Sequence, residues 1–217
     1  RFGPVGGAST SRARCSAPAP GRREHACLHL RGARPPELAE RRGRHAEGPE
    51  RVLDRTVQLA RDLVAKTGLP VAAIHRIGIG CAGPVDRQAG LILNPPNLPG
   101  WVRVPLVEFF EKALGHPAVL ENDANAAALG EFRYGAGKGA QSLVYLTVST
   151  GIGGGIILDG KIWHGLKDGA GEVGHMTLVP DGPLCGCGNR GCLEARASGP
   201  SIARRAREAL AAGQPSG

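Results

Sequence analysis

The stretch AVLENDANAAALGEF, residues 118–132, predicts a strand that runs directly into a helix. AVLEN is typical of a short strand, and the alanine-rich DANAAALGEF is typical of a helix. Asp123 falls at the junction, where side chains of α/β folds point into a cleft. Because Asp is a preferred helix cap and Asn shapes turns, a purely structural role stays open for Asp123 and Asn122. The functional alternative is a general base that takes the proton of an attacking hydroxyl, with Asn122 holding a neighbouring hydroxyl.

The segments on either side of this stretch alternate between helical and strand patterns. The expected helices cover 49–68, 105–115 and about 201–212. The expected strands lie within 74–86, 90–101, 118–122, 142–149, 155–158 and 161–163, with an Asp159-Gly160 turn before the last. Helices alternate with strands in the first half and hairpins appear in the second, which predicts an α/β fold with mixed sheets.

The net charge of +8 is concentrated near the N-terminus. Residues 1–46 hold ten Arg, no Lys, three Glu and no Asp, whereas the remainder holds 17 basic and 16 acidic residues. A nearly neutral remainder argues against a nucleic-acid partner. Residues 1–46 are rich in Arg, Pro and Gly and lack a sustained apolar period, so we expect a disordered or foreign segment. With neither a membrane span nor a secretory signal visible, we expect a cytoplasmic protein without a membrane partner.

A glycine-rich stretch, TVSTGIGGGII, covers residues 147–157. A strand delivers Ser149, Thr150 and Gly151 to a turn in which Gly153 to Gly155 let the backbone approach a ligand closely, with N–H groups that could cradle phosphate. The stretch is neither a dinucleotide fingerprint nor a Walker A loop, because no Lys-Ser/Thr follows and the next element is a strand. A glycine-rich hairpin without a ligand is the alternative.

Three cysteines, Cys185, Cys187 and Cys192, lie within eight positions in CGCGNRGC. Together with His175 they offer the four nitrogen and sulfur ligands that tetrahedral zinc prefers, and a full set of four implies a closed structural site. Disulfides compete with this interpretation, but they leave one thiol over and the tight spacing disfavours a bridge without strain. His175 and the preceding Glu172 could also be ordinary polar residues at a turn.

Four motifs in this order, ENDANAAALGE, STGIGGGII, GAGEVGHM and CGCGNRGCLEARASG, resemble the ROK family of repressors, open reading frames and sugar kinases. The set is most similar to the family's bacterial glucokinases and spans roughly residues 47–212. The resemblance implies an actin-like ATPase fold (ribonuclease H-like), in which two α/β lobes enclose a hexose and ATP. Residues 47–122 would be the remainder of the N-terminal lobe, and 123–217 a partial C-terminal lobe with the phosphate loop and the zinc motif.

The resemblance also implies an activity, ATP-dependent phosphorylation of a hexose such as glucose to glucose 6-phosphate, with Mg²⁺ bound to ATP and a homodimeric assembly. Asp123 matches the base that activates the sugar 6-hydroxyl. The sugar contacts match Asn97, Asn122, Asp123, Glu172, His175 and Glu194. The ATP-phosphate contacts match Thr150, Gly151, Gly153 and Gly154. The structural Zn²⁺ ligands match His175, Cys185, Cys187 and Cys192, so His175 would hold metal through one ring nitrogen and sugar through the other.

The sequence departs from the family pattern at both ends. The family's D-x-G-G-T motif is expected before residue 47, and only VGGAST (5–10) resembles it, without the Asp. The adenosine-contacting segment and closing helix expected after residue 213 are not seen. Two further interpretations therefore stay open, an inactive fragment of the kinase and a sugar-sensing repressor. Residues 1–46 show no paired amphipathic helices that could form the helix-turn-helix of such a repressor.

Overall fold

The expected strand and helix around Asp123 are both present in the computed structural model. It describes residues 48–68, 70–95, 98 and 100–214, so the expectations for 1–46 and for Asn97 lie outside it. Strand β5 (Ala118–Asn122) pairs in parallel with β1 (Ile77–Cys81), with Cys81 opposite Asn122. Helix α3 (Asp123–Tyr134) follows β5 without a loop. The junction therefore stands at the carboxyl end of a parallel pair.

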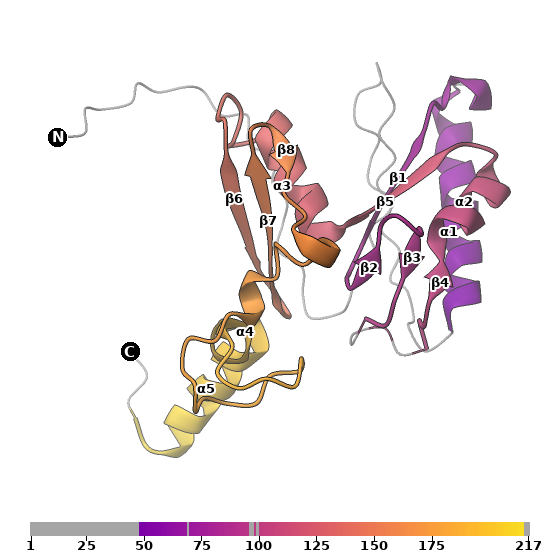
Figure 1. The fold of residues 1–217 in the computed structure, drawn as a ribbon. Coiled ribbons are helices and arrows are strands. Elements are labelled where there is room, and N and C mark those ends of the chain that lie inside the picture. Colours follow the sequence, from indigo (N-terminus) through magenta and orange to yellow (C-terminus); the bar gives the residue numbers. More distant parts are fainter. Residues whose placement is uncertain (1–47, 69, 96–97, 99, 215–217) are drawn as a thin grey trace.

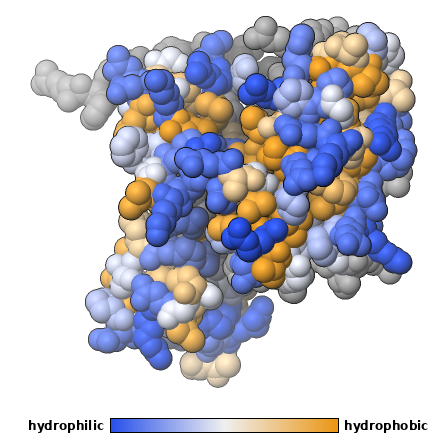
Figure 2. Space-filling view, turned by 45° about the vertical axis from the view of Figure 1, so that its right-hand side comes forward, coloured by the Kyte–Doolittle hydropathy of each residue, from blue (hydrophilic) through white to orange (hydrophobic). Residues whose placement is uncertain are grey.

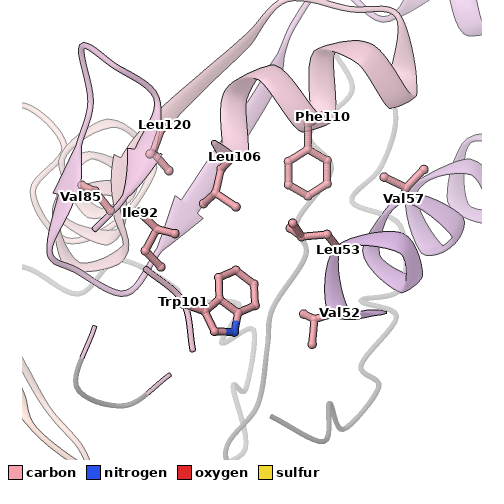
Figure 3. Packing of buried hydrophobic residues seen from close by; sticks show 9 residues of the cluster. All are labelled: Val52, Leu53, Val57, Val85, Ile92, Trp101, Leu106, Phe110 and Leu120. Atoms are coloured by element: carbon pink, nitrogen blue, oxygen red, sulfur yellow. The ribbon is translucent and has the colours of Figure 1, made fainter. Parts of the chain in front are cut away.

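Two helices cover this pair and build the first hydrophobic core. Helix α1 (Pro49–Thr67) begins at a proline, and it and α2 (Leu106–Leu114) each end at a left-handed glycine. Figure 3 shows Phe110 of α2 pointing toward Leu53 of α1, with Trp101 beneath Leu106. The full buried cluster comprises Val52, Leu53, Val57, Val85, Ile92, Trp101, Leu106, Phe110 and Leu120.

A small antiparallel sheet and a single helical turn complete this half. The sheet has the order β2-β3-β4, and its strands are β2 (Val85–Asp86), β3 (Leu91–Ile92) and β4 (Val104–Pro105). The turn is the 3₁₀ helix η2 (Val71–Ala73). Ile92 of β3 is fully buried, so this sheet contributes directly to the first core.

The second half contains the expected hairpins. Strands β6 (Leu143–Val148), β7 (Ile152–Leu158) and β8 (Lys161–Ile162) form an antiparallel sheet in that order. Asp159 (φ 48°) and Gly160 (φ 76°) make the turn into β8, as expected for an Asp-Gly hairpin. Helix α3 packs on β7, and Ala128, Phe132 and Ile157 form a separate buried cluster. Figure 1 shows this sheet and α3 on the opposite side from α1 and α2.

The glycines expected in a phosphate-binding turn lie inside β7. Gly153 and Gly154 are paired with Thr147 and Leu146 of β6, and the turn itself is limited to Ser149–Gly151. A β-carbon on Gly155 would stand 2.5 Å from the Ala128 β-carbon, and one on Gly154 would stand 2.7 Å from Val173 Cγ2. The expectation that Gly153 to Gly155 belong to the turn is therefore wrong: they lie in a strand, where they allow neighbouring elements to pack closely.

The remaining elements are short except for the last helix. They are η3 (Leu166–Asp168), η4 (Val173–His175), α4 (Leu193–Ala197) and α5 (Gly199–Ala211). Helix α5 begins two residues before its expected start, after Ser198, and α4 was not expected. No described helix is both long enough and apolar enough to cross a membrane. Several large apolar side chains stay exposed, and Figure 2 shows apolar patches among hydrophilic residues on one face.

Candidate functional site

At the junction between β5 and α3, one of two neighbouring side chains caps the helix and the other is exposed. Asn122 is the N-cap, and its Oδ1 accepts hydrogen bonds from the backbone N–H of Ala124 (2.9 Å) and Asn125 (3.2 Å). Asp123 is the first helical residue, and its exposed carboxylate accepts a hydrogen bond from the N–H of Ala124 at 2.9 Å. The main capping role therefore belongs to Asn122, and Asp123 stands at the positively polarised end of α3.

The turn after β6 lies against the start of α4. Thr150 is exposed, and the Ser149 N–H donates to the Gly151 carbonyl across the turn at 2.8 Å. Glu194 in the first turn of α4 accepts the Ile152 N–H through Oε2 at 2.8 Å. A β-carbon on Gly151 would lie 2.5 Å from that same oxygen. Glu194, expected to face a sugar, therefore contacts the turn expected to bind phosphate.

The three thiols and the His175 imidazole converge on one point. Their ligand atoms all lie within 4.8 Å of one another. The Cys185 Sγ is 3.6 Å from His175 Nδ1, and the Cys187 and Cys192 Sγ atoms are 3.8 Å apart. Ligands at ordinary zinc–sulfur and zinc–nitrogen bond lengths stand about 3.5 to 3.8 Å apart in a tetrahedron. These side chains fit a tetrahedral metal ion.

Burial and hydrogen bonding shift the thiol pKa values in opposite directions. Burial raises the pKa of Cys185, and burial together with the neighbouring thiols raises the pKa of Cys192 to about 11. A hydrogen bond from the backbone N–H of Asn189 lowers the pKa of Cys187. Because metal binds the thiolate, a metal ion entering this group would release protons, chiefly from the two buried cysteines.

The second ring nitrogen of His175 faces a different partner. Its Nε2 lies 3.7 Å from Glu172 Oε2, while its Nδ1 faces Cys185. The two ring nitrogens are therefore divided between the thiol group and a half-exposed carboxylate. Glu172 thus lies on the side of the ring away from the thiols.

Short contacts link these pieces into one region. A β-carbon on Gly153 would lie 3.3 Å from the β-carbon of Ala124, so β7 packs against the first turn of the helix that Asp123 begins. Glu194 joins the Ser149–Gly151 turn to Cys185, whose Sγ is 3.8 Å from Glu194 Oε1. All the expected site residues except Asn97 lie in the described part of the chain.

A second polar group next to the site was missed by the sequence reasoning. It centres on Glu121, whose Oε2 lies 2.8 Å from His164 Nε2 and whose Oε1 accepts from Asn125 Nδ2 at 3.2 Å. Arg87 donates to Asp168 at 3.0 Å and lies 3.9 Å from Glu121. The available signal was a carboxylate placed directly before the Asn122-Asp123 pair in an otherwise apolar strand.

Comparison with known proteins places these features in a family. A model of the ROK family matches residues 28–216, which includes the C-terminal part of the atypical N-terminal segment. Glucokinase from Streptomyces coelicolor is 43% identical over 160 residues, and N-acetylmannosamine kinase from Citrobacter koseri is 43% identical over 137. The chain spans about half the length of these curated relatives, 49% and 47% respectively.

A solved structure supports the same relationship. The ROK hexokinase from Thermus thermophilus superposes with a TM-score of 0.67 at 45% identity. The match covers 78% of this chain and 55% of that one. The expected fold class is therefore confirmed, and the chain holds part of it.

Proposed function

The chain belongs to the ROK family, and from this membership we propose that it contributes to the transfer of the γ-phosphoryl group of ATP to the 6-hydroxyl of a hexose. Glucose is the acceptor we favour, because relatives named glucokinase reach 49% identity with this chain, and N-acetylmannosamine is the one to compare, because a relative named for it reaches 43%. The two buried clusters, one before Asn122 and one after Asp123, support a division into two lobes at this junction. ATP with Mg²⁺ would be the phosphoryl donor.

The observation that carries the proposal is the arrangement at the start of α3. Because Asn122 supplies the principal cap, the exposed Asp123 carboxylate is available to take the proton of an attacking sugar hydroxyl. Phosphoryl transfer requires little covalent chemistry from the protein, so catalysis would rest on the position of this base and on charge stabilisation.

The sugar would be held by polar side chains around this base. Glu172 and the Nε2 of His175 lie together and can pair with neighbouring hydroxyls, and Asn122 can offer its amide nitrogen. A closed site built for hydroxyls rejects ligands that leave its polar groups without partners, which gives such a site its sugar specificity. We expect Asn97 to join this set, although it lies outside the described residues.

The phosphate groups of ATP would lie near the turn at Thr150 and Gly151. Backbone N–H groups of a tight turn can bind phosphate oxygens, and Mg²⁺ would offset the remaining charge. The Ile152 N–H is taken by Glu194, which fixes one side of this turn. Gly153 would contribute by allowing the strand behind the turn to lie close to α3, and Gly154 by allowing Val173 of η4 to lie close to the same strand.

Zn²⁺ is the metal that suits His175, Cys185, Cys187 and Cys192, by ligand type and by the distances between their atoms. With four protein ligands it would be structural. Bound there, the ion would stabilise the segment between η4 and α4, and with it the positions of His175 and Glu194. No step of phosphoryl transfer needs to pass through it.

The test is a coupled assay of the full chain with glucose and ATP, beside the variant Asp123→Asn. We expect the variant to lose turnover by about 10²–10⁴-fold, since a general base contributes this much. Asp54→Asn, on the exposed side of α1, is the matched control and should keep full turnover. Turnover that survives in Asp123→Asn would remove Asp123 as the base.

The other two interpretations give different results in the same experiments. An inactive fragment would show no turnover in any variant. A sugar-sensing repressor would bind a specific DNA sequence in a salt-dependent assay, and any helix-turn-helix before Gly48 lies outside the described residues. Sequence-specific DNA binding without turnover would replace the kinase proposal.

A further inference from the structure

The Glu121 side chain contacts three separate parts of the molecule. Its Oε1 accepts from Asn125 Nδ2 on α3 at 3.2 Å and from the backbone N–H of Asn122 at 3.0 Å. Its Oε2 lies 2.8 Å from Nε2 of His164, which follows β8, and 3.9 Å from Nε of Arg87, which follows β2. One carboxylate thus connects the end of β5 with both halves of the chain.

The group is partly shielded from water. The side chains of Glu121 and His164 are 19% and 22% exposed, and those of Arg87 and Asp168 are 29% and 21% exposed. Hydrogen bonds between charged groups gain strength in such surroundings, and a charge that loses its partner there becomes costly. This arrangement differs from the exposed ion pair of Glu108 with Lys112 on α2, where both side chains are mostly in water.

The segment that His164 begins has an unfavourable backbone. Lys167 and Asp168 both have left-handed conformations, with φ of 58° and 57°, which L-residues seldom adopt in succession. Asp168 is held by the Arg87 guanidinium at 3.0 Å, and the Ala170 N–H donates to the His164 carbonyl at 3.0 Å. One side-chain ion pair and one backbone hydrogen bond therefore maintain a conformation that the local backbone disfavours.

The residues that make these contacts lie close in sequence to Asp123 and Glu172, which are both assigned to the sugar site. Glu121 is two positions before Asp123 on a continuous strand and helix, and Asp168 is four positions before Glu172. A β-carbon on Gly171 would lie 3.4 Å from Asn125 Oδ1, so this segment packs directly on α3. Any movement of the 164–171 segment would therefore change the distance between Asp123 and Glu172.

We propose that Glu121 is a positioning residue, whose bond to His164 fixes the segment that carries Glu172 relative to the Asp123 base. The Arg87–Asp168 ion pair is a second contact that holds the same segment. The proposal rests on the proposed function, because it takes Asp123 as the base and Glu172 as a sugar contact. Glu121 itself would touch neither sugar nor ATP.

The experiment compares His164→Ala with His164→Gln and Glu121→Ala in the full chain. Gln can place an amide nitrogen near the Nε2 position of His164 and keep the donor to Glu121, whereas Ala cannot. Glu108→Ala, which removes an exposed carboxylate from an ion pair on α2, is the matched control. Each variant is measured for kcat, for KM of glucose and of ATP, and for hydrogen exchange of the peptide covering residues 163–172.

We expect His164→Ala and Glu121→Ala each to lower kcat about tenfold or more, since small displacements of a reacting group are costly. The KM for ATP should stay within about twofold of the unaltered value, because the phosphate turn is not involved. Hydrogen exchange in 163–172 should become faster in both alanine variants, and His164→Gln should keep most of the kcat and of the protection from exchange. The double variant Glu121→Ala/His164→Ala should be no worse than Glu121→Ala alone, because both changes remove the same bond.

Two results would overturn the proposal. One is unchanged kcat and exchange in His164→Ala; the other is equal impairment in His164→Gln and His164→Ala. If the unaltered chain shows no turnover, the proposed function fails, and exchange alone decides whether Glu121 fixes the segment. Faster exchange in both alanine variants, with protection kept in His164→Gln, then supports a positioning role for the Glu121–His164 bond. Equal exchange in all three variants overturns it.

Discussion

The Glu194 carboxylate connects two parts of the site that are 42 residues apart in the chain. One of its oxygens accepts the Ile152 N–H, and the other lies near Cys185 Sγ. Ile152 is buried, so its N–H has little access to water. Glu194 therefore links the segment of the metal group to the turn that precedes β7.

Replacing Glu194 by Ala should leave the buried Ile152 N–H without this acceptor. We expect a loss of about 1–3 kcal/mol in the free energy of unfolding, the usual penalty for such a group. Glu194→Gln keeps an oxygen at the same distance from the backbone and should lose less. Urea denaturation followed by circular dichroism measures both, and equal midpoints for the two variants and the unaltered chain would contradict the expectation.

Asn122 and Asp123 show what a sequence can predict for adjacent residues. Both types favour helix starts, so capping preference alone does not decide which one caps α3. The structure assigns the cap to Asn122, whose backbone is extended (φ −62°, ψ 141°), and leaves Asp123 as the first helical residue. The decision depends on where β5 ends, and this boundary is fixed by pairing with β1.

At the scale of elements, the close packing of strand β7 against its neighbours depends on glycines. Gly154 and Gly155 are buried where Val173 and Ala128 approach, and a β-carbon at either position would lie under 3.0 Å from a neighbouring side-chain atom. The Gly171 and Tyr145 backbones are also close to Gly154. Gly155 therefore sets the spacing between α3 and the sheet, and Gly154 sets the spacing between the sheet and the segment of Gly171 and Val173.

Gly155→Ala should destabilise the chain, because its new methyl group would overlap Ala128 and the Ala124 carbonyl. Overpacking of this kind costs about 1–3 kcal/mol. Gly78→Ala is the matched control in strand β1, where nothing lies within 4 Å of the added carbon. Thermal unfolding of both variants measures the difference, and similar melting temperatures would show that α3 can move away at little cost.

Removal of metal should destabilise the segment between η4 and α4. A ligand that binds only the folded chain contributes about 4 kcal/mol when its free concentration is about 1,000 times its Kd, so chelation should lower the melting temperature clearly. Cys192→Ser should lose the metal, and Cys81→Ser, outside the group, should keep it. Elemental analysis of protein prepared without chelator measures the content. Less than about 0.5 equivalent of zinc would argue against a structural site of ordinary affinity.

The regular elements were predictable from the sequence because each has a local signal. Apolar spacing and a terminal glycine predicted α1, a proline at the start and a glycine after the end predicted α2, and the Asp159-Gly160 pair predicted the β7–β8 hairpin. The contacts of Glu121 with His164 and Arg87 have no such local signal, because these residues lie 43 and 34 positions away along the chain. The glycines of β7 were misassigned to the turn before it, since a glycine run can serve close packing as well as flexibility.

At the scale of the whole molecule, strand β6 exposes a row of apolar side chains. Val144, Leu146 and Val148 alternate along β6 and are 67%, 57% and 60% exposed. Strand β6 also stands at the edge of its sheet. Exposed apolar edges are prone to pair with other chains.

Replacing Val144, Leu146 and Val148 together by Thr should reduce aggregation of the 217-residue chain. Thr keeps the preference for strands and adds a hydroxyl, so stability should change by less than about 1 kcal/mol at exposed positions. Light scattering at rising protein concentration measures the first effect and urea denaturation the second. A larger loss of stability would mean that this face is covered in solution.

The direct passage from β5 to α3 has a consequence for motion. Within the described residues the backbone crosses only once from the first hydrophobic cluster to the second, at Asn122 and Asp123, without an intervening loop. If one half rotates against the other when ligands enter, the pivot lies at this crossing, and atoms near a pivot travel least. The Asp123 carboxylate would then act as a nearly stationary point, toward which the surfaces of both halves turn.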